Sequence, residues 1–120
     1  MYEIASKKNQ QHSAENKVSL HWGDIWSIPY STDYFDAIFG SNVHFFWKEP
    51  VLEFDFLQRF LKPGGKLVMV FQPRWVKSPA ELIREMERIR NDFNEAGYKR
   101  IKMELKTMKP VDCVFIEGCK

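Results

Sequence analysis

Residues 61–72 read LKPGGKLVMVFQ and place a turn directly before an apolar run. Pro63, Gly64 and Gly65 are residues that stop a helix and turn the chain. The following run, KLVMVFQ over residues 66–72, is apolar almost throughout, which is typical of a strand buried inside a parallel sheet. The glycines do not form a phosphate-binding loop, because that loop runs from strand to helix and requires Gly-x-x-x-x-Gly-Lys-Ser/Thr.

Upstream of this turn the pattern predicts two helices and two strands. A helix begins at Pro50, which suits a first helical position. Its apolar residues recur at helical spacing: Leu52, Phe56, Leu57, Phe60 and Leu61. The run FDAIFG over residues 35–40 indicates a buried strand. VSLHW over 18–22 alternates as a half-buried strand does, and residues 1–12 indicate a short helix.

Downstream of the turn, the best-delimited helix spans residues 79–96. Ser78 can cap it, Pro79 occupies its first position, and Glu81 completes a capping box. One apolar stripe follows the helix: Leu82, Met86, Ile89 and Phe93. Gly97 is placed for the left-handed turn that ends a helix.

Two strands complete the pattern. Residues 100–106 alternate charged and apolar side chains, which predicts a half-buried strand, and residues 111–117 predict a last strand. The short Lys109-Pro110 turn between them implies antiparallel pairing. Because helices separate the earlier strands, the sequence predicts an α/β fold with a parallel sheet that an antiparallel hairpin closes at the carboxyl end.

Length and composition predict one domain over residues 1–120, with a mass of 14.3 kDa. Hydrophobic residues at 44% and charged residues at 28% exclude a disordered or low-complexity chain. The sequence contains no run of about 18 apolar residues, so it predicts no membrane-spanning helix. The amino-terminal residues lack the apolar core of a signal peptide, so we expect a cytoplasmic protein.

The charge is uneven although its net value is only +2. Residues 1–60 carry five basic and eight acidic side chains, and residues 61–120 carry thirteen and eight. The basic excess lies largely in Lys99, Arg100, Lys102, Lys106 and Lys109. An edge strand guarded by charges is favoured over a polyanion-binding patch, so nucleic acid is not an expected partner.

Cysteines and histidines do not predict a disulfide or a metal site. Cys113 and Cys119 would lie roughly 20 Å apart in one extended strand, whereas a disulfide needs Cα atoms within about 7 Å. His12, His21 and His44 show no metal-ligand spacing with these cysteines. We therefore expect free thiols and no zinc.

In combination, five segments resemble the class I S-adenosylmethionine-dependent methyltransferases. They are VSLHWGD at 18–24, Ile28-Pro29 followed by FDAI at 35–38, SNVH at 41–44, LKPGGKL at 61–67, and EAGY at 95–98. They fall in the family's order and cover nearly the whole chain. The resemblance implies a Rossmann-like sheet of strand order 3-2-1-4-5-7-6 with helices on both faces, and S-adenosylmethionine as cofactor.

The resemblance is to the carboxy-terminal part of that family. No GxGxG cofactor loop occurs in the sequence, and neither does the family's second strand with its ribose-binding acidic residue. An incomplete sheet would leave the 35–40 strand with an open apolar edge, so we expect a homo-oligomer or a complementing chain there. We expect weak or no methyl transfer by this chain alone. The alternative is a non-catalytic binding or assembly module that pairs through the same edge.

The resemblance also implies cofactor-binding residues. Gly23 and Asp24 end a strand, and Asp24 would accept a hydrogen bond from the adenine amino group. Ile25 would offer its backbone N–H and an apolar wall to the adenine ring. Ser41 and Asn42 would line the methionine end of the cofactor. The alternative readings are a turn-forming Asp24 and a loop over 41–42 that only connects two elements.

Residues after Asn42 are the candidates for binding the methyl acceptor. His44 could act as a base or hydrogen-bond donor, or be purely structural. Phe45 belongs to an aromatic run, residues 45–47, that could shape a substrate pocket or pack beneath the following helix. Methyl transfer from a sulfonium depends mainly on positioning, so no catalytic residue is assigned. The sequence does not identify the acceptor.

Overall fold

The computed structural model describes residues 25–27, 29–42 and 47–120. Two short elements come first, the 3-10 helix η1 (Ile25–Ser27) and strand β1 (Phe35–Ser41). The later elements are α3 (Pro50–Gln58), β2 (Leu61–Phe71), α4 (Pro79–Glu95), β3 (Lys99–Lys106) and β4 (Cys113–Cys119). The helix predicted over 1–12 and the strand predicted over 18–22 lie outside the described residues.

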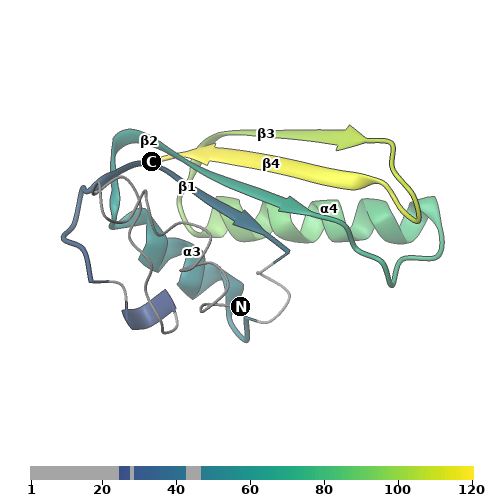
Figure 1. Ribbon diagram of the computed structural model, residues 1–120, viewed down its shortest axis with the longest axis horizontal. Helices are drawn as coiled ribbons and strands as arrows, with labels where there is room; N and C mark the ends of the chain where they lie inside the picture. The colour runs from purple at the N-terminus through teal and green to yellow at the C-terminus, as the bar shows by residue number, and fades with distance from the viewer. Residues whose placement is uncertain (1–24, 28, 43–46) are drawn as a thin grey trace, which may run out of the picture.

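The described strands form one mixed sheet in the order β1-β2-β4-β3 (Figure 1). β1 pairs with β2 in parallel, and β4 pairs antiparallel with both β2 and β3. This arrangement confirms the predicted parallel sheet with a carboxy-terminal antiparallel hairpin. It is also the 4-5-7-6 order that the resemblance implies for these four strands.

Helices α3 and α4 cover one face of this sheet, as Figure 1 shows. The core between them contains Phe54 of α3 and Phe93 of α4, whose ring centroids are 4.8 Å apart and whose side chains are fully buried. Burial of each such side chain contributes about 1.5–3 kcal/mol. Leu67, Met69 and Ile116 supply the sheet side of the same core. No described helix is long and apolar enough to span a membrane.

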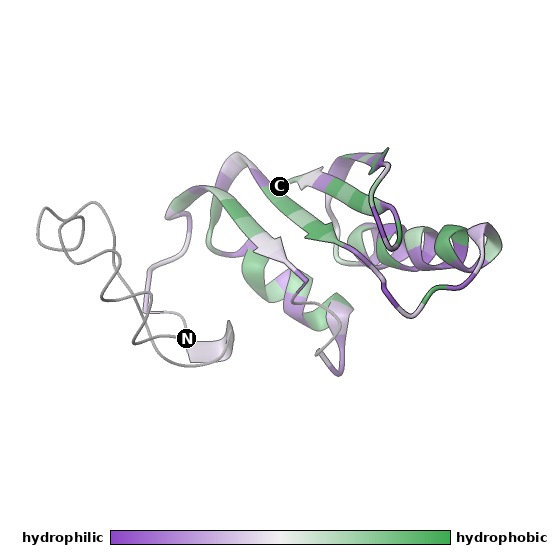
Figure 2. Ribbon diagram, turned by 45° about the vertical axis from the view of Figure 1, so that its right-hand side comes forward, coloured by the Kyte–Doolittle hydropathy of each residue, from purple (hydrophilic) through white to green (hydrophobic). Residues whose placement is uncertain are grey.

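The α4 helix begins at the predicted Pro79 and ends at Glu95, one residue before the predicted end. The Ser78 hydroxyl accepts a hydrogen bond from the Glu81 amide at 3.2 Å, and Gly97 follows the helix with φ of +94°. The Glu81 carboxylate accepts from the Lys77 amide rather than from Ser78, so the capping box closes one residue upstream. Green and purple alternate along α4 in Figure 2, as expected for a helix with one buried face.

The helix predicted from Pro50 to Leu61 is shorter than its apolar spacing indicated. α3 ends at Gln58, and its buried side chains include Phe54 and Leu57, whereas Leu52 is 53% exposed. The stripe through Leu52 was therefore a wrong prediction. The physical reason is that Leu61 already pairs with β1, so the last apolar residues of the pattern belong to the start of β2.

β2 begins before the Pro63-Gly64-Gly65 turn, five residues earlier than predicted. Its pairing with β1 shifts register across this turn, and Gly64 has φ of +83°. A Cβ added at Gly65 would lie 2.9 Å from the Lys62 carbonyl oxygen and 3.0 Å from that of Asp36. The sequence thus predicted the turn at these glycines. The turn forms a bulge within the paired part of β1 and β2, whereas the prediction placed it before the strand.

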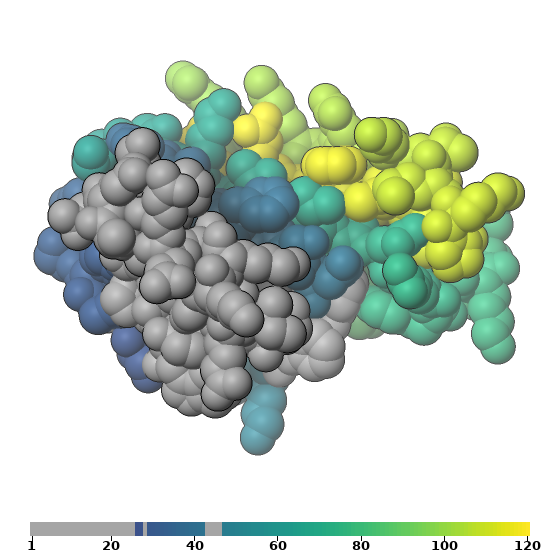
Figure 3. Space-filling model, viewed as in Figure 1, coloured from purple at the N-terminus to yellow at the C-terminus, as the bar shows by residue number. Residues whose placement is uncertain are grey.

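β1 and β3 are the outer strands of the described sheet. No described strand pairs with the second edge of β1, as expected for this strand. Phe39 is 66% exposed and no residue of β1 is fully buried, so the prediction of a buried strand was wrong. The side chains of β3 protrude from the surface in Figure 3, and Lys99 and Lys102 are exposed. This position agrees with the charged-edge interpretation of the basic residues.

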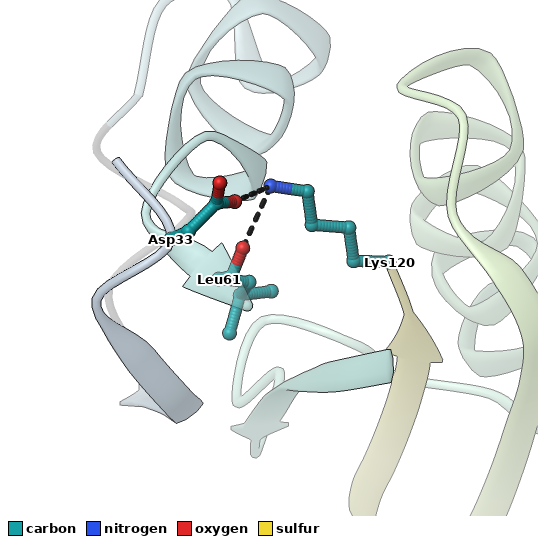
Figure 4. Close-up of polar contacts among 3 residues, drawn as sticks. All are labelled: Asp33, Leu61 and Lys120. Carbon is teal, nitrogen blue, oxygen red and sulfur yellow. Dashed lines mark hydrogen bonds and ion pairs between the residues drawn. The ribbon is translucent and has the colours of Figure 1, made fainter. Parts of the chain in front are cut away.

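Near the start of β2, Lys120 connects the end of β4 with the segment before β1 and the first residue of β2 (Figure 4). Its ammonium group donates to Oδ1 of Asp33 and to the carbonyl oxygen of Leu61, both at 2.7 Å. β4 runs from Cys113 to Cys119, so it begins and ends two residues later than predicted. Both cysteines are free, which confirms the prediction that they do not pair.

Candidate functional site

The carboxyl ends of β1 and β2 meet at one edge of the sheet. The two strands are parallel, and Ser41 at the end of β1 lies opposite Val70 near the end of β2. Small ligands of open α/β sheets bind outside the carboxyl ends of parallel strands, where the connecting loops diverge. The first place to look for a cofactor or substrate is therefore the segment that follows Ser41 together with the segment that follows Phe71.

Asn42 ties these two carboxyl ends together. Its amide donates to the Val70 carbonyl oxygen at 2.8 Å, and its side-chain oxygen accepts from the Gln72 amide at 2.9 Å. The residue has φ of +54°, a left-handed conformation that asparagine adopts more readily than most residues. The sequence therefore places at this point a residue that can both turn the chain and bond the neighbouring strand.

Gln72 extends this connection to the loop between β3 and β4. Its Nε2 donates to the Val111 carbonyl oxygen at 2.7 Å and to that of Lys109 at 3.2 Å. One continuous polar chain thus runs from β1 through β2 to the loop before β4. Sequence reasoning treated Gln72 only as the last residue of a strand. A polar side chain directly after an apolar run was the signal that could have identified it.

The predicted site residues fall in different places. Ser41 and Asn42 lie together at the sheet edge, and both are exposed. Ile25 begins η1, which contacts α3 through Trp26, whose ring centroid is 4.6 Å from that of Phe56. Gly23, Asp24, His44 and Phe45 lie outside the described residues. The binding roles of all seven remain predictions.

One buried acidic group lies near η1. The Glu53 side chain is 8% exposed, and its Oε2 has no hydrogen-bond partner among the described residues. Burial raises the pKa of this carboxyl, although a hydrogen bond from Trp26 acts in the opposite direction. Among the residues that the structure describes, no group of three or more His, Cys, Asp or Glu side chains could hold a metal ion.

The sequence matches known proteins along most of its length. A family described as "Methyltransferase domain" matches residues 1–69. YdaC of Bacillus subtilis (strain 168), named as an uncharacterized methyltransferase, is 30% identical over 94 residues, which are 78% of this chain and 52% of that protein. The chain therefore spans about half the length of this curated relative.

Solved structures share the fold at low sequence identity. A SAM-dependent methyltransferase from Aquifex aeolicus aligns with a TM-score of 0.68 and 19% identity over 98% of this chain and 62% of that one. The [4+2]-cyclase SpnF aligns with a TM-score of 0.76 and 14% identity over 99% and 62%. Together with the family match, these similarities confirm the resemblance found in the sequence. The chain belongs to the methyltransferase domain family and has the fold of the class I S-adenosylmethionine-dependent methyltransferases.

Proposed function

We propose that this chain contributes the acceptor-side part of an S-adenosylmethionine-dependent methyltransferase. The observation that carries the proposal is the Asn42–Gln72 connection, which fixes the carboxyl ends of β1 and β2 relative to each other. A displacement at a methyl group requires donor and acceptor to be held in line, so a rigid edge at this position serves the reaction. The family match over residues 1–69 includes Ser41 and Asn42, and Gln72 lies three residues beyond its end.

The proposed cofactor contacts follow the family resemblance. Gly23, Asp24 and Ile25 would hold the adenine, and Ser41 with Asn42 would lie at the methionine end. The exposed hydroxyl and amide at the edge suit the polar groups of the methionine part. The cofactor supplies a methyl group already activated on a sulfonium. His44 and Phe45 are proposed to face the acceptor.

The residues of this chain do not supply every part of a cofactor site. None of the six glycines forms a GxGxG loop, so the backbone cradle for the methionine part is not supplied by these 120 residues. We therefore propose that a second polypeptide segment completes the cofactor site. The edge of β1 supports this proposal, because no described strand pairs with it.

Calorimetric titration with S-adenosylmethionine tests the proposal. The chain alone is expected to bind weakly, and binding is expected to strengthen when a polypeptide with the GxGxG loop and its two strands is added. Tritium transfer from labelled cofactor to a panel of small-molecule and protein acceptors then reports activity. If neither the chain nor the mixture binds cofactor, the proposed function is wrong.

A non-catalytic binding or assembly module is the second candidate. The specific support is that SpnF, named as a [4+2]-cyclase, shares this fold, so the fold does not by itself require methyl transfer. A module of this kind would self-associate or bind a partner through the β1 edge without binding cofactor. Calorimetric titration with S-adenosylmethionine in the presence of the added polypeptide separates the two candidates, because only the enzyme hypothesis predicts cofactor binding by the assembled pair.

A further inference from the structure

A pocket of about 370 Å³ lies between one face of α4 and the start of α3. Two of its lining residues come from the segments after β1 and β2, namely Trp47 and Trp75, and four come from one face of α4. Among the described residues, the lining consists of Trp47, Pro50, Trp75, Glu85, Arg88, Ile89 and Asp92. Ile25, Ser41 and Asn42, the described residues that are proposed to bind cofactor, are not part of this lining.

The apolar part of this lining is aromatic. Trp47 is held in place by an edge contact to Phe54, with ring centroids 5.1 Å apart and an interplanar angle of 70°. Trp75 lies in the loop after β2 and is 49% exposed. Ile89, which is almost fully buried, adds an aliphatic surface from α4. Two indoles beside an aliphatic side chain form a wall that attracts apolar groups and cations alike.

The polar part of the lining carries a net negative charge. Glu85 and Asp92 are carboxylates, whereas Arg88 supplies a single positive charge. Arg88 is directed to Glu85, with a nitrogen–oxygen distance of 3.6 Å, and its side chain is 74% exposed. The Asp92 carboxylate makes no hydrogen bond or close ion pair to a described residue. Partial burial and the charge of Glu95 raise the pKa of this carboxyl, whereas the charge of Arg88 lowers it. A ligand with one positive charge would neutralise the excess.

We propose that this pocket binds a small organic ammonium ion, with the cation against the indoles and beside the Asp92 carboxylate. The aromatic wall excludes a strongly hydrated inorganic cation, because such an ion keeps oxygen ligands that indoles do not offer. An alkylated ammonium has a weakly hydrated surface that contacts indole faces favourably. The proposal concerns binding only and holds whether or not the chain transfers methyl groups.

Choline is the probe for this site, and its neutral isostere 3,3-dimethylbutan-1-ol is the ligand control. Titration of the full chain is followed by the indole N–H signals in two-dimensional nuclear magnetic resonance spectra. We expect saturable choline binding that shifts the signals of Trp47 and Trp75, with the isostere bound about tenfold more weakly. The Trp26 signal, which arises from η1, is expected to stay in place.

Matched variants distinguish this site from non-specific binding. Asp92→Asn is expected to weaken choline binding about tenfold, and Trp75→Leu is expected to weaken it to a similar extent. Glu87→Gln removes the same charge from an exposed position of α4 outside the lining and is expected to leave affinity unchanged. Equal binding of choline and its isostere, equal loss in the Glu87 and Asp92 variants, or no saturable binding would each overturn the proposal.

Discussion

The Lys120 ammonium lies 2.7 Å from the Asp33 carboxylate, although 87 positions separate them in the sequence. The same ammonium binds the Leu61 carbonyl oxygen, so one side chain connects the end of β4 with the entries to β1 and β2. Lys120 is largely shielded, with 26% of its side chain exposed. This contact therefore joins the carboxyl end of β4 to a segment 87 positions earlier in the chain.

Replacement of Lys120 by methionine is expected to lower the free energy of unfolding by about 1–2 kcal/mol, because a carbonyl oxygen and a carboxylate lose a charged donor. Urea denaturation followed by circular dichroism measures the change. Lys62→Met is the control, since its ion pair with Asp36 is 3.4 Å long and both side chains are at least half exposed. That control should change stability by less than about 0.5 kcal/mol. Equal losses in both variants would contradict the assigned role.

Asn42 offers a test of the sheet edge. Asn42→Leu removes the acceptor for the Gln72 amide and places a branched side chain in a left-handed conformation. Together these effects are expected to cost about 2–3 kcal/mol of stability. Asn42→Asp keeps an acceptor at the same position and should retain most of the stability. Thermal unfolding of the two variants would contradict this account if both lost the same amount.

The turn before β2 allows two adjacent glycines to be compared. Gly65→Ala is expected to lower stability by about 1–3 kcal/mol, because its Cβ would approach two backbone carbonyl oxygens within 3.0 Å. Gly64 has open space around its Cα and a left-handed φ, so Gly64→Asn should be tolerated. Chemical denaturation of both variants tests the assignment, which fails if Gly64→Asn proves the more damaging change.

Glu53 predicts a pH dependence of stability. Burial raises its pKa above the ordinary value of 4.5 in the folded chain. The folded state therefore holds this proton more tightly than the unfolded state, and the associated stability is present below about pH 4.5 and lost as pH rises through the folded-state pKa. Glu53→Gln cannot ionise, so at pH 7 it should have a higher free energy of unfolding than the parent chain.

The difference between the parent chain and Glu53→Gln should shrink as pH falls towards 4.5, and urea midpoints measured across this range would show it. Asp55→Asn is the matched control on the same helix, because Asp55 is exposed. A control that reproduced the pH effect, or a Glu53 variant without one, would contradict burial as the cause.

Local signals explain what the sequence predicted well. The bounds of α4 are set by Ser78, Pro79 and Gly97, which act within one turn of the helix ends, so no distant contact is needed to place them. The antiparallel hairpin was likewise determined by a short connection. The strand order followed from the family resemblance, since propensity alone does not order strands in a sheet.

Long-range contacts explain what the sequence did not predict. The end of α3 depends on the pairing of Leu61 with Phe35, a contact that helical periodicity cannot detect. The role of Gln72 depends on two carbonyl oxygens 37 and 39 positions away. The pocket between the helices depends on how α3 and α4 approach each other, so Trp47 and Asp92 appeared unrelated in the sequence.

The Gln72 bridge has a consequence for how this protein can vary. The Gln72 side chain reaches from the end of β2 to the backbone carbonyl oxygens of Lys109 and Val111. The length of that hairpin connection and the identity of residue 72 are therefore coupled. An insertion within residues 107–112 would pull the glutamine away from Asn42 or leave it unbonded. Descendants of this sequence should therefore change both features together or keep both.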